Sequence, residues 1–377
     1  MRFALCLYKF FPYGGLQRDF LSIAKICLER GHEVDVYTTS WEGKKLEKGK
    51  IHIIPAQGYS NHTRMKRFSN RLNALLAKKS YDAIIGFNKL EGLDIYYGAD
   101  TIFAKQINGK GLLYRILPRY RTYLQLERSI FAPESKTKIL ILSAKEIDSY
   151  TSYYGTPRER FEILPPGIPK NRVLSLDGRS IRDEYGVPDD FKIVLVVGSG
   201  FKTKGVDRAI KAVGSLPNLI RKKTLLWIIG RGKERGYLKL AKRVGIYNNV
   251  KFFGPREDVP QFLNEADLLL HPARKEAAGI VIIEAMCVGL PVLVTGVCGY
   301  AEHVRKAQAG RIVEIPFQQG QLNKLLLEML NDPRLKDMGE RGKGYIYENG
   351  FFELHERVVD IIEQYVLKLT GGTILVT

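Results

Sequence analysis

The chain alternates short apolar runs with longer stretches in which apolar residues recur every three or four positions. Residues 2–8 form the first apolar run, and apolar side chains then follow at helical spacing from Leu16 to Leu28. Gly31 marks the end of that predicted helix, and a second apolar run covers residues 33–38. Strand, amphipathic helix and strand in this order make a βαβ unit, which predicts a parallel sheet.

The same alternation continues to the end of the chain. Further strands are predicted at residues 81–87, 138–143, 192–197, 224–229, 250–253, 266–271, 290–295 and 311–314. At 377 residues the chain is longer than one hydrophobic core usually serves. We therefore expect an α/β protein with two Rossmann-like, doubly wound domains.

The domain boundary is predicted at residues 165–167, where two prolines and a glycine oppose the continuation of a helix or a strand. This gives an N-terminal domain over residues 1–166 and a C-terminal domain over residues 167–350. One more amphipathic helix is predicted at about residues 351–369, and we expect it to pack back on the N-terminal domain.

Charge and cysteine content narrow the class of protein. Lys and Arg total 59 against 40 Asp and Glu, a net charge of +19, which implies a polyanionic partner. No apolar run approaches the roughly 20 residues that a membrane helix needs. The four cysteines form no CxxC pair, which argues against a zinc site or a disulfide framework and favours the reducing cytoplasm.

Two glycine-containing turns join a predicted strand to a predicted helix. The first holds Gly14 and Gly15, with Asp19 one turn into the helix, and its free N–H groups suit an anion; a plain tight turn is the alternative. The second, at residues 198–207, carries Lys204 among three glycines and predicts a diphosphate cradle, the alternative being a solvated basic loop. Neither turn matches GxGxxG or GxxxxGK[ST], so dinucleotide binding and ATP hydrolysis are not indicated.

Two carboxylates eight residues apart carry the strongest signal. Glu276 follows the apolar strand at 266–271, and Glu284 interrupts the apolar string 280–283 on a predicted helix. Slightly more than two helical turns separate them, so both acids could face one ligand at different depths. An acid on a largely buried helix needs a partner, and vicinal sugar hydroxyls are a natural one.

At this point the residues carry a resemblance. The Glu-x7-Glu pair, its Ala-Ala-Gly flank, the string 289–292 and the turn at 298–300 resemble the retaining, nucleotide-sugar-dependent glycosyltransferases of family 4, which have the GT-B fold. The strings 7–20, 40–43, 86–89 and 164–168 are similar to the lipopolysaccharide core glucosyltransferases of that family. The resemblance implies two domains that face each other across a cleft, UDP-glucose as the donor and a lipid-linked inner-core heptose as the acceptor.

The resemblance also implies roles for individual residues. Glu284 would bind the ribose of UDP, Glu276 the hydroxyls of the donor sugar, and Lys204 the diphosphate. The other implied donor-binding residues are Gly14, Gly15, Arg172, Cys298, Gly299 and Tyr300. Arg172 is included because many relatives have an arginine where Ser199 stands here, so another cation must stabilise the leaving group.

A retained anomeric configuration arises either by double displacement or by attack on the face from which the leaving group departs. We favour same-face attack, because no carboxylate in the sequence must be a nucleophile. Asp19 and Asp100 are candidates to orient donor or acceptor hydroxyls, and with Glu276 they form the predicted catalytic set. The chain has no Asp-x-Asp motif, so we expect no metal and no other cofactor.

Basic residues mixed with Tyr and Leu between positions 105 and 131 predict a surface that faces an anionic membrane leaflet. Its predicted membrane-facing cations are Lys105, Lys110, Arg115, Arg119, Arg121 and Arg128. The alternative is a solvated helix face. The resembled glycosyltransferases are membrane-associated, so the resemblance favours the membrane surface and implies a location in the cytoplasm, at the inner face of the cytoplasmic membrane.

Two other functions remain open on the sequence alone. A UDP-sugar epimerase of the GT-B fold would share the doubled α/β pattern and the paired acids. A non-enzymatic polyanion-binding protein would account for the charge, but no zinc, RNP-like or helix-turn-helix signature supports a nucleic-acid partner.

Overall fold

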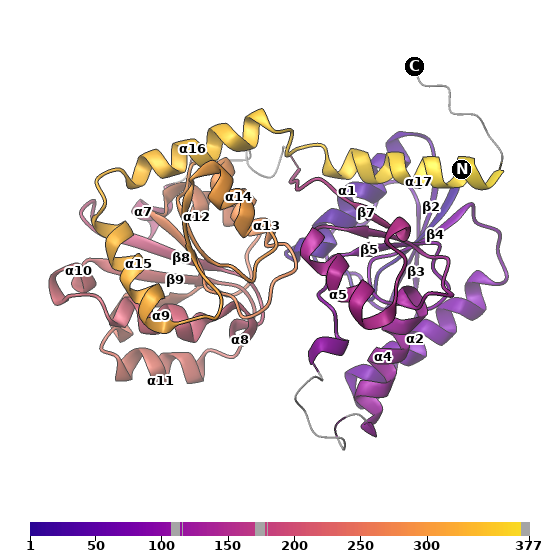
Figure 1. Cartoon of the computed structure of the whole chain (residues 1–377), viewed down its shortest axis with the longest axis horizontal. Coiled ribbons are helices and arrows are strands. Elements are labelled where there is room, and N and C mark those ends of the chain that lie inside the picture. Colours follow the sequence, from indigo (N-terminus) through magenta and orange to yellow (C-terminus); the bar gives the residue numbers. More distant parts are fainter. Residues whose placement is uncertain (107–113, 115, 170–177, 179, 371–377) are drawn as a thin grey trace. The chain divides into compact units, whose positions relative to one another are not determined.

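The computed structural model describes residues 1–106, 114, 116–169, 178 and 180–370. The chain forms two compact units (Figure 1). Unit 1 comprises Met1–Pro165 together with Leu354–Thr377, and unit 2 comprises Pro166–Glu353. No helix within the described residues is both long and apolar enough to cross a membrane.

Unit 1 is built on a parallel sheet of seven strands. Their order in space is β3 (Lys50–Ile53), β2 (Glu33–Thr38), β1 (Arg2–Cys6), β4 (Ala83–Gly86), β5 (Ile95–Gly98), β6 (Lys138–Ile141) and β7 (Phe161–Ile163). The order reverses between β1 and β4, since β1 pairs with both β2 and β4. Such a switch point is where doubly wound sheets leave room for ligands beyond their carboxyl ends.

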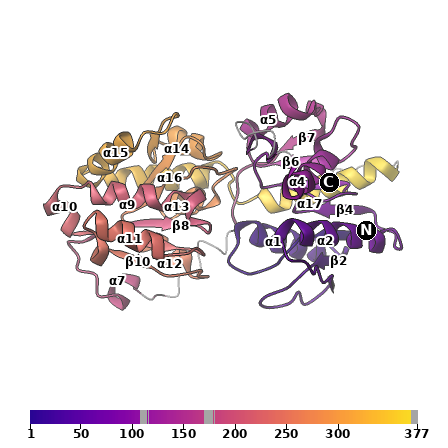
Figure 2. The same ribbon diagram turned by 90° about the horizontal axis from the view of Figure 1, so that it is seen from below.

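Helices cover both faces of this sheet (Figure 1, Figure 2). One face is covered by α2 (Asn61–Leu76), α4 (Pro118–Phe131) and α5 (Ala144–Tyr154), whose apolar residues share one core with alternate residues of the strands. The other face carries α1 (Gly15–Glu29) and α17 (Leu354–Thr370), which pack against each other. The short 3₁₀ turns of unit 1 are η1 (Ala104–Gln106) and η2 (Arg158–Arg160).

Helix α17 is fixed to α1 by buried and exposed polar contacts. Nε2 of His355 lies 2.9 Å from Oδ1 of Asp19, and both residues are at most 3% exposed. At the other end of α1, Arg30 pairs with three carboxylates of α17, those of Glu356, Asp360 and Glu363. The last helix in the sequence is therefore a structural part of the first domain.

Unit 2 has a second parallel sheet, of six strands. Their order in space is β10 (Val250–Phe252), β9 (Thr224–Ile229), β8 (Lys192–Val197), β11 (Leu268–His271), β12 (Val292–Thr295) and β13 (Gly310–Val313). The strands at its centre are continuous apolar runs, as expected for a sheet buried on both faces.

The helices of unit 2 again form a layer on each side of the sheet (Figure 1). One layer consists of α9 (Val206–Gly214), α11 (Arg235–Arg243) and α15 (Gln319–Asn331). The other consists of α12 (Val259–Glu265), α13 (Ile280–Cys287), α14 (Ala301–Ala307) and α16 (Leu335–Glu348). The shorter elements are α7 (Ile181–Glu184), α8 (Phe201–Lys204), α10 (Asn218–Lys222) and η3 (Tyr247–Asn249).

The fold class predicted from the sequence is confirmed, with two doubly wound α/β sheets. All ten predicted strands are present, and their ends differ from the predicted ones by no more than two residues. Strands β3, β5 and β7 were not predicted. Each has only three or four residues, and β3 and β7 are edge strands with polar residues among the apolar ones, so neither gives a clear period.

Candidate functional site

Three loops of unit 2 gather the predicted donor-binding residues at one edge of its sheet. They follow the neighbouring strands β8, β11 and β12, and carry Lys204, Glu276 and the turn 296–300 respectively. In a parallel sheet the carboxyl ends of the strands lie at the same edge, which is the usual ligand-binding edge of an α/β fold. The topology thus brings together segments that are up to about a hundred residues apart in the sequence.

Glycines allow the first two loops to approach each other closely. A Cβ atom at Gly205 would lie 2.0 Å from the carbonyl oxygen of Pro272, and the φ angle of Gly205 is +73°. A Cβ atom at Gly198 would lie 2.8 Å from Cε of Lys204. A larger residue at Gly205 would push the Lys204 loop away from the loop that carries Glu276, and one at Gly198 would displace the side chain of Lys204 itself.

Arg274 ties the same two loops together. Its backbone N–H donates to the carbonyl of Thr203 at 2.7 Å, and its guanidinium donates to both carboxylate oxygens of Asp207 at 2.7 Å. A bidentate pair of this kind fixes orientation as well as distance. The loop after β11 is therefore held in register with α8 and α9 before any ligand arrives.

Lys204, His271 and Glu276 meet at the centre of this edge. One carboxylate oxygen of Glu276, Oε2, accepts from Nζ of Lys204 and lies 3.1 Å from Nε2 of His271. Burial opposes ionisation of Glu276, but the hydrogen bond from His271 and the charge of Lys204 outweigh it and hold the pKa of Glu276 at about 2. The carboxylate is therefore charged at neutral pH although only 15% of its side chain is exposed.

His271 acts on this carboxylate as a neutral donor. Its side chain is fully buried, and burial lowers its pKa below the usual 6.5. Since the carboxylate only accepts hydrogen bonds, the proton of the neutral ring lies on Nε2. Within the described residues, Nδ1 of His271 has no hydrogen-bond partner.

The second acid of the pair is more deeply buried. Glu284 lies on α13 and is 3% exposed. Helix α13 begins after Gly279, which has a φ angle of +95°, and the backbone N–H of Tyr300 donates to the carbonyl of Ala278 at 2.9 Å. That bond links the turn with Cys298, Gly299 and Tyr300 to the start of α13, the helix that carries Glu284.

Comparison with known proteins identifies the family. Residues 177–345 match the model for glycosyl transferases group 1, and residues 13–172 match the model for glycosyltransferase family 4. The chain is 42% identical over 375 residues to lipopolysaccharide glucosyltransferase WaaG of Escherichia coli K12, an alignment that covers 98% of each chain. The chain is a family 4 glycosyltransferase.

Solved structures agree with this assignment. A crystal structure of WaaG, described as a glycosyltransferase involved in lipopolysaccharide biosynthesis, superposes with a TM-score of 0.92 at 42% identity, covering 96% of this chain and 99% of that one. Anabaena Alr3699/HepE, solved with UDP and glucose, superposes at 0.74 with 17% identity over 97% of this chain and 100% of its own, a likeness of fold alone. Because the chain belongs to this family, it is an enzyme, and the non-enzymatic polyanion-binding alternative is ruled out.

The predicted site residues of unit 1 do not lie together. Gly14, Gly15 and Asp19 lie at the cap and in the first turns of α1, and Asp100 lies in a pocket described below. Gly14 caps α1 without a side-chain hydrogen bond, α1 begins at Gly15, and a Cβ atom at Gly14 would lie 1.9 Å from Oε1 of Gln17. Asp19 is buried, and besides His355 it accepts a hydrogen bond from the hydroxyl of Tyr97 at 2.9 Å. Its carboxylate is thus already engaged inside unit 1, and a direct role with a sugar hydroxyl stays a prediction.

Asp100 lies instead in a pocket of about 300 Å³ that was not predicted from the sequence. Asn88, Lys89 and Arg119 line the same pocket. The sequence could have indicated this pocket only through the positions of its residues, because residues 88–89 and 100–101 closely follow the ends of β4 and β5. β5 was not recognised as a strand, so this convergence could not be predicted.

The predicted membrane-facing cations that the structure describes lie in different settings, and their contact with a membrane stays a prediction. Arg119 lines the pocket, whereas Arg121 and Arg128 are exposed on another side of α4. Nζ of Lys105 donates to Oγ of Ser149 at 2.6 Å. The remaining two, Lys110 and Arg115, lie outside the described residues, as does Arg172, the predicted substitute for the cation missing at Ser199.

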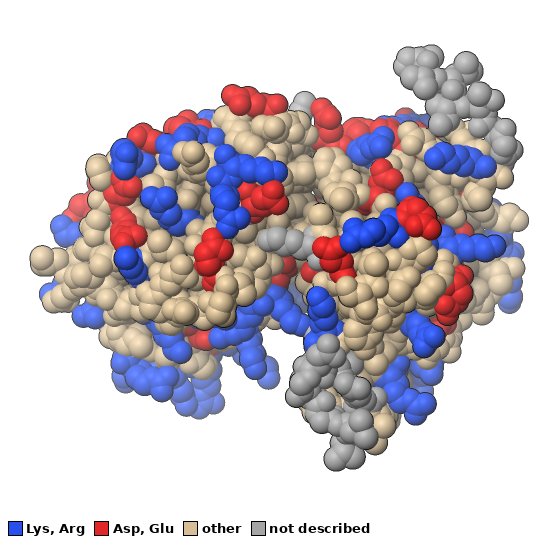
Figure 3. Space-filling model, viewed as in Figure 1, with Lys and Arg blue, Asp and Glu red and all other residues tan. Residues whose placement is uncertain are grey.

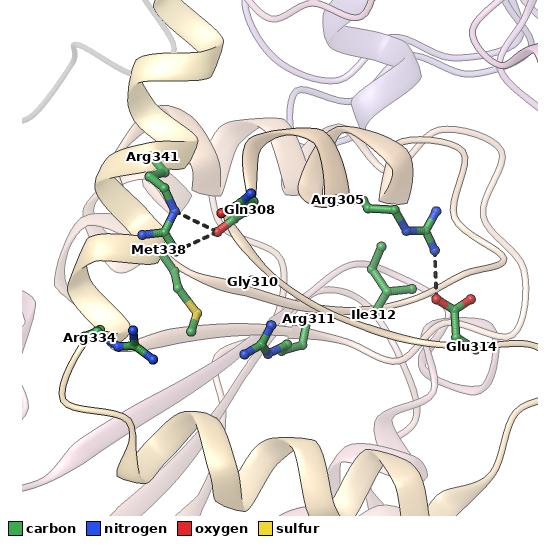
Figure 4. Close-up of a pocket in the computed structure, with 9 residues that line it drawn as sticks. All are labelled: Arg305, Gln308, Gly310, Arg311, Ile312, Glu314, Arg334, Met338 and Arg341. Atoms are coloured by element: carbon green, nitrogen blue, oxygen red, sulfur yellow. Dashed lines mark hydrogen bonds and ion pairs between the residues drawn. The ribbon is translucent and has the colours of Figure 1, made fainter.

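A second pocket, of about 440 Å³, lies along the edge strand β13 of the glycosyltransferase and contains four arginines (Figure 4). Arg305 pairs with Glu314 at 2.8 Å, and Arg341 donates to the carbonyl of Gln308. Figure 4 shows Arg311 and Arg334 extending toward each other across the pocket. The residues come from α14, β13, α16 and the positions that directly flank them. Charged side chains at an edge strand oppose pairing with other chains.

Proposed function

We propose that this glycosyltransferase transfers glucose from UDP-glucose to a heptose of the lipopolysaccharide inner core, with retention of the anomeric configuration and without a metal ion. The observation that carries the proposal is the charged carboxylate of Glu276 held by Lys204 and His271 at the carboxyl edge of unit 2. The choice of sugar and acceptor is supported by the full-length similarity to the E. coli lipopolysaccharide glucosyltransferase.

The contact between Lys204 and Glu276 suggests how the donor is accommodated. A diphosphate carries more negative charge than one carboxylate, so we expect Nζ of Lys204 to leave Glu276 and pair with the diphosphate. The N–H of His271 then keeps Glu276 charged and oriented, and its free lone pairs accept hydrogen bonds from the glucose hydroxyls. Glu284, buried on α13, accepts from the ribose hydroxyls.

Same-face transfer then needs no protein nucleophile. The bond between C1 of glucose and the diphosphate oxygen breaks, and the acceptor oxygen forms its bond to C1 on the same face. The acceptor proton moves to the departing diphosphate oxygen, and the electron pair of the broken bond stays on that oxygen. Lys204 stabilises the negative charge that develops on the departing diphosphate. Electrostatic stabilisation of this kind is usually the largest single contribution to the rate of an enzymatic reaction.

The proposal is tested with the purified chain, a heptose-containing core oligosaccharide, and UDP-glucose, UDP-galactose or UDP-N-acetylglucosamine. We expect transfer from UDP-glucose in the presence of EDTA, and an α-linked product by NMR. A β-linked product would overturn retention, and loss of activity with EDTA would overturn metal independence. Conversion of the UDP-sugar without acceptor would instead support the epimerase alternative.

We also propose that the enzyme binds the anionic inner leaflet of the cytoplasmic membrane. Figure 3 shows Lys and Arg gathered around α2 and α4 in unit 1 and over α11 in unit 2. A cation near an anionic leaflet contributes about 1 kcal/mol, so replacing Arg121 and Arg128 together by Gln should weaken vesicle binding by roughly tenfold or more. Sedimentation with phosphatidylglycerol vesicles at low salt measures this, and no binding by the unchanged protein would overturn the proposal.

A further inference from the structure

The pocket of unit 1 lies where a parallel sheet usually binds its ligand. Asn88 and Lys89 follow the carboxyl end of β4, and Asp100 and Thr101 follow that of β5. Helix α4 contributes Arg119, Tyr123 and Leu126, α2 contributes Met65, and Phe103 lies on the loop after β5. The pocket is therefore at the carboxyl edge of the sheet, and its volume of about 300 Å³ accommodates one or two sugar rings.

The floor of the pocket is rigid and electrically balanced. Nζ of Lys89 donates to the carbonyl of Thr101 and to Oε2 of Glu127, both at 3.0 Å. Glu127 is fully buried and also accepts from the backbone N–H groups of Phe103 and Ala104. This network fixes the loop after β5 to α4, and the charge of Lys89 is balanced by that of Glu127.

Helix α4 turns one face to the pocket. Arg119, Tyr123 and Leu126 are spaced by four and three positions, so they lie on one side of the helix, and all three line the pocket. Arg121 and Arg128 come two and nine positions after Arg119, which at about 100° per residue places them on the opposite side. The same helix thus separates the cation of the pocket from the cations on the outer surface.

The polar groups above this floor have free hydrogen-bonding capacity. Oδ1 of Asn88 accepts from the backbone N–H of Tyr8 at 2.7 Å, which fixes the amide and leaves its NH2 group available. In the described part of the chain, the carboxylate of Asp100 and the guanidinium of Arg119 make no hydrogen bond or ion pair, although both line one pocket. An acceptor, a donor and a cation therefore converge without being used by the protein itself.

Two aromatic side chains complete the wall. The rings of Phe103 and Tyr123 lie 5.3 Å apart at 57°. Burial raises the pKa of the Tyr123 hydroxyl, an effect that the charge of Arg119 partly offsets, so the phenol keeps its proton. Aromatic surface beside a few directed polar groups is typical of small-molecule sites, and it suits the apolar C–H face of a sugar ring.

We propose that this pocket is a saccharide subsite that selects an acidic acceptor, with Arg119 pairing with a carboxylate or phosphate on the sugar chain. Asp100 and the amide of Asn88 bind hydroxyls of the same ligand. The inference rests on the proposed function in one respect, since it takes the ligand to be the acceptor. A neutral acceptor would leave the guanidinium of Arg119 without an anion, so the pocket discriminates by charge.

Three synthetic acceptors test this selectivity. They share one heptose-containing disaccharide and differ in one substituent, which is a carboxylate, its neutral methyl ester, or a phosphate. Since a hydrogen bond to a charged group is worth more than a neutral one, we expect the wild-type KM to be roughly ten- to a hundredfold lower for an acidic acceptor than for the ester. The carboxylate and phosphate arms show which acid is preferred.

Arg119→Gln should raise the KM for the acidic acceptors to that of the ester, with kcat and the KM for UDP-glucose unchanged. Lys336→Gln, which removes an exposed cation from α16 in unit 2, is the control and should behave as wild type. An equal loss with the ester and the acidic acceptors in Arg119→Gln would overturn the proposal. So would a wild-type enzyme that does not distinguish them.

Calorimetric binding of the same three compounds without donor separates this inference from the proposed function. An acid preference that disappears in Arg119→Gln supports the subsite even if no glucose is transferred, and then only the proposed reaction fails. Equal affinity of wild type for all three compounds, together with active transfer, overturns the subsite and leaves the reaction in place.

Discussion

The charged residues of the proposed donor region in unit 2 and of the unit 1 pocket differ in whether they are paired within the protein. In unit 2, Lys204 and Glu276 are paired with each other, and His271 and Arg274 hold the surrounding loops. In unit 1, Asp100 and Arg119 are exposed and line one pocket without pairing, as judged over the described residues.

Burial explains the difference. A charge removed from water costs several kcal/mol unless it is paired, so the largely buried Glu276 must have partners before a ligand binds. Asp100 and Arg119 are solvated and need none. The proposed donor region can therefore be pre-organised by its own ion pairs, whereas the unit 1 pocket can leave its charges unpaired.

The largest expected effect comes from removing the charge of Glu276. Glu276→Gln leaves Lys204 and His271 without their shared carboxylate, and kcat/KM for transfer should fall by about 10²–10³. The assay is initial-rate kinetics with UDP-glucose and acceptor. Glu328→Gln, which changes an exposed carboxylate on α15, is the control; near-normal turnover by Glu276→Gln would refute the site assignment.

A smaller effect is expected at the second acid of unit 2. If Glu284 accepts hydrogen bonds from the ribose, Glu284→Gln should weaken UDP binding by roughly ten- to a hundredfold. Calorimetric titration with UDP measures this directly. Unchanged affinity in a variant that melts at the wild-type temperature would remove Glu284 from the donor site.

Asp100 tests the other side of the comparison. Because its carboxylate is exposed and makes no ion pair with any described residue, Asp100→Asn should leave stability unchanged and lower kcat/KM for the acceptor by about tenfold. Affinity for UDP should stay as in wild type. A fall in UDP affinity equal to the fall in acceptor use would contradict an acceptor role.

The smallest effect concerns pH. Burial lowers the pKa of His271 below 6.5, so the unfolded chain binds a proton more readily than the folded one just below that pH. The free energy of unfolding should therefore fall as the pH drops below 6.5. In the variant His271→Asn this free energy should fall less steeply with pH. Urea denaturation of both proteins between pH 7.5 and 5.5 provides the measurement; parallel curves would show that His271 does not contribute.

The sequence predicted the fold where local signals were strong. Apolar runs such as 192–197 and 224–229 became β8 and β9 with the predicted bounds. β5, with the sequence IYYG, is too short to show a period, and it owes its place to pairing with β4 and β6. Contacts between distant segments, rather than local propensity, decide such strands.

In the proposed donor region, too, the contacts between distant segments could not be predicted from local signals. Spacing alone marked Glu276 and Glu284, but the hydrogen bond from His271 and the clamp between Arg274 and Asp207 depend on how two loops meet above the sheet. The sequence grouped Arg119 with Arg121 by composition. Arg119 and Arg121 are distinguished only by their positions around α4, because Arg119 lines the pocket and Arg121 does not.

The contact between Asp19 and His355 has a consequence for biosynthesis. Asp19 is buried in the first domain, and one of its two partners is supplied by the last helix. A ribosome delivers that helix only after the whole of unit 2, and until then α1 has an uncovered apolar side and a carboxylate without that partner. The first domain to emerge is therefore the last to be completed, and while the second is made it exposes apolar surface of the kind that favours aggregation.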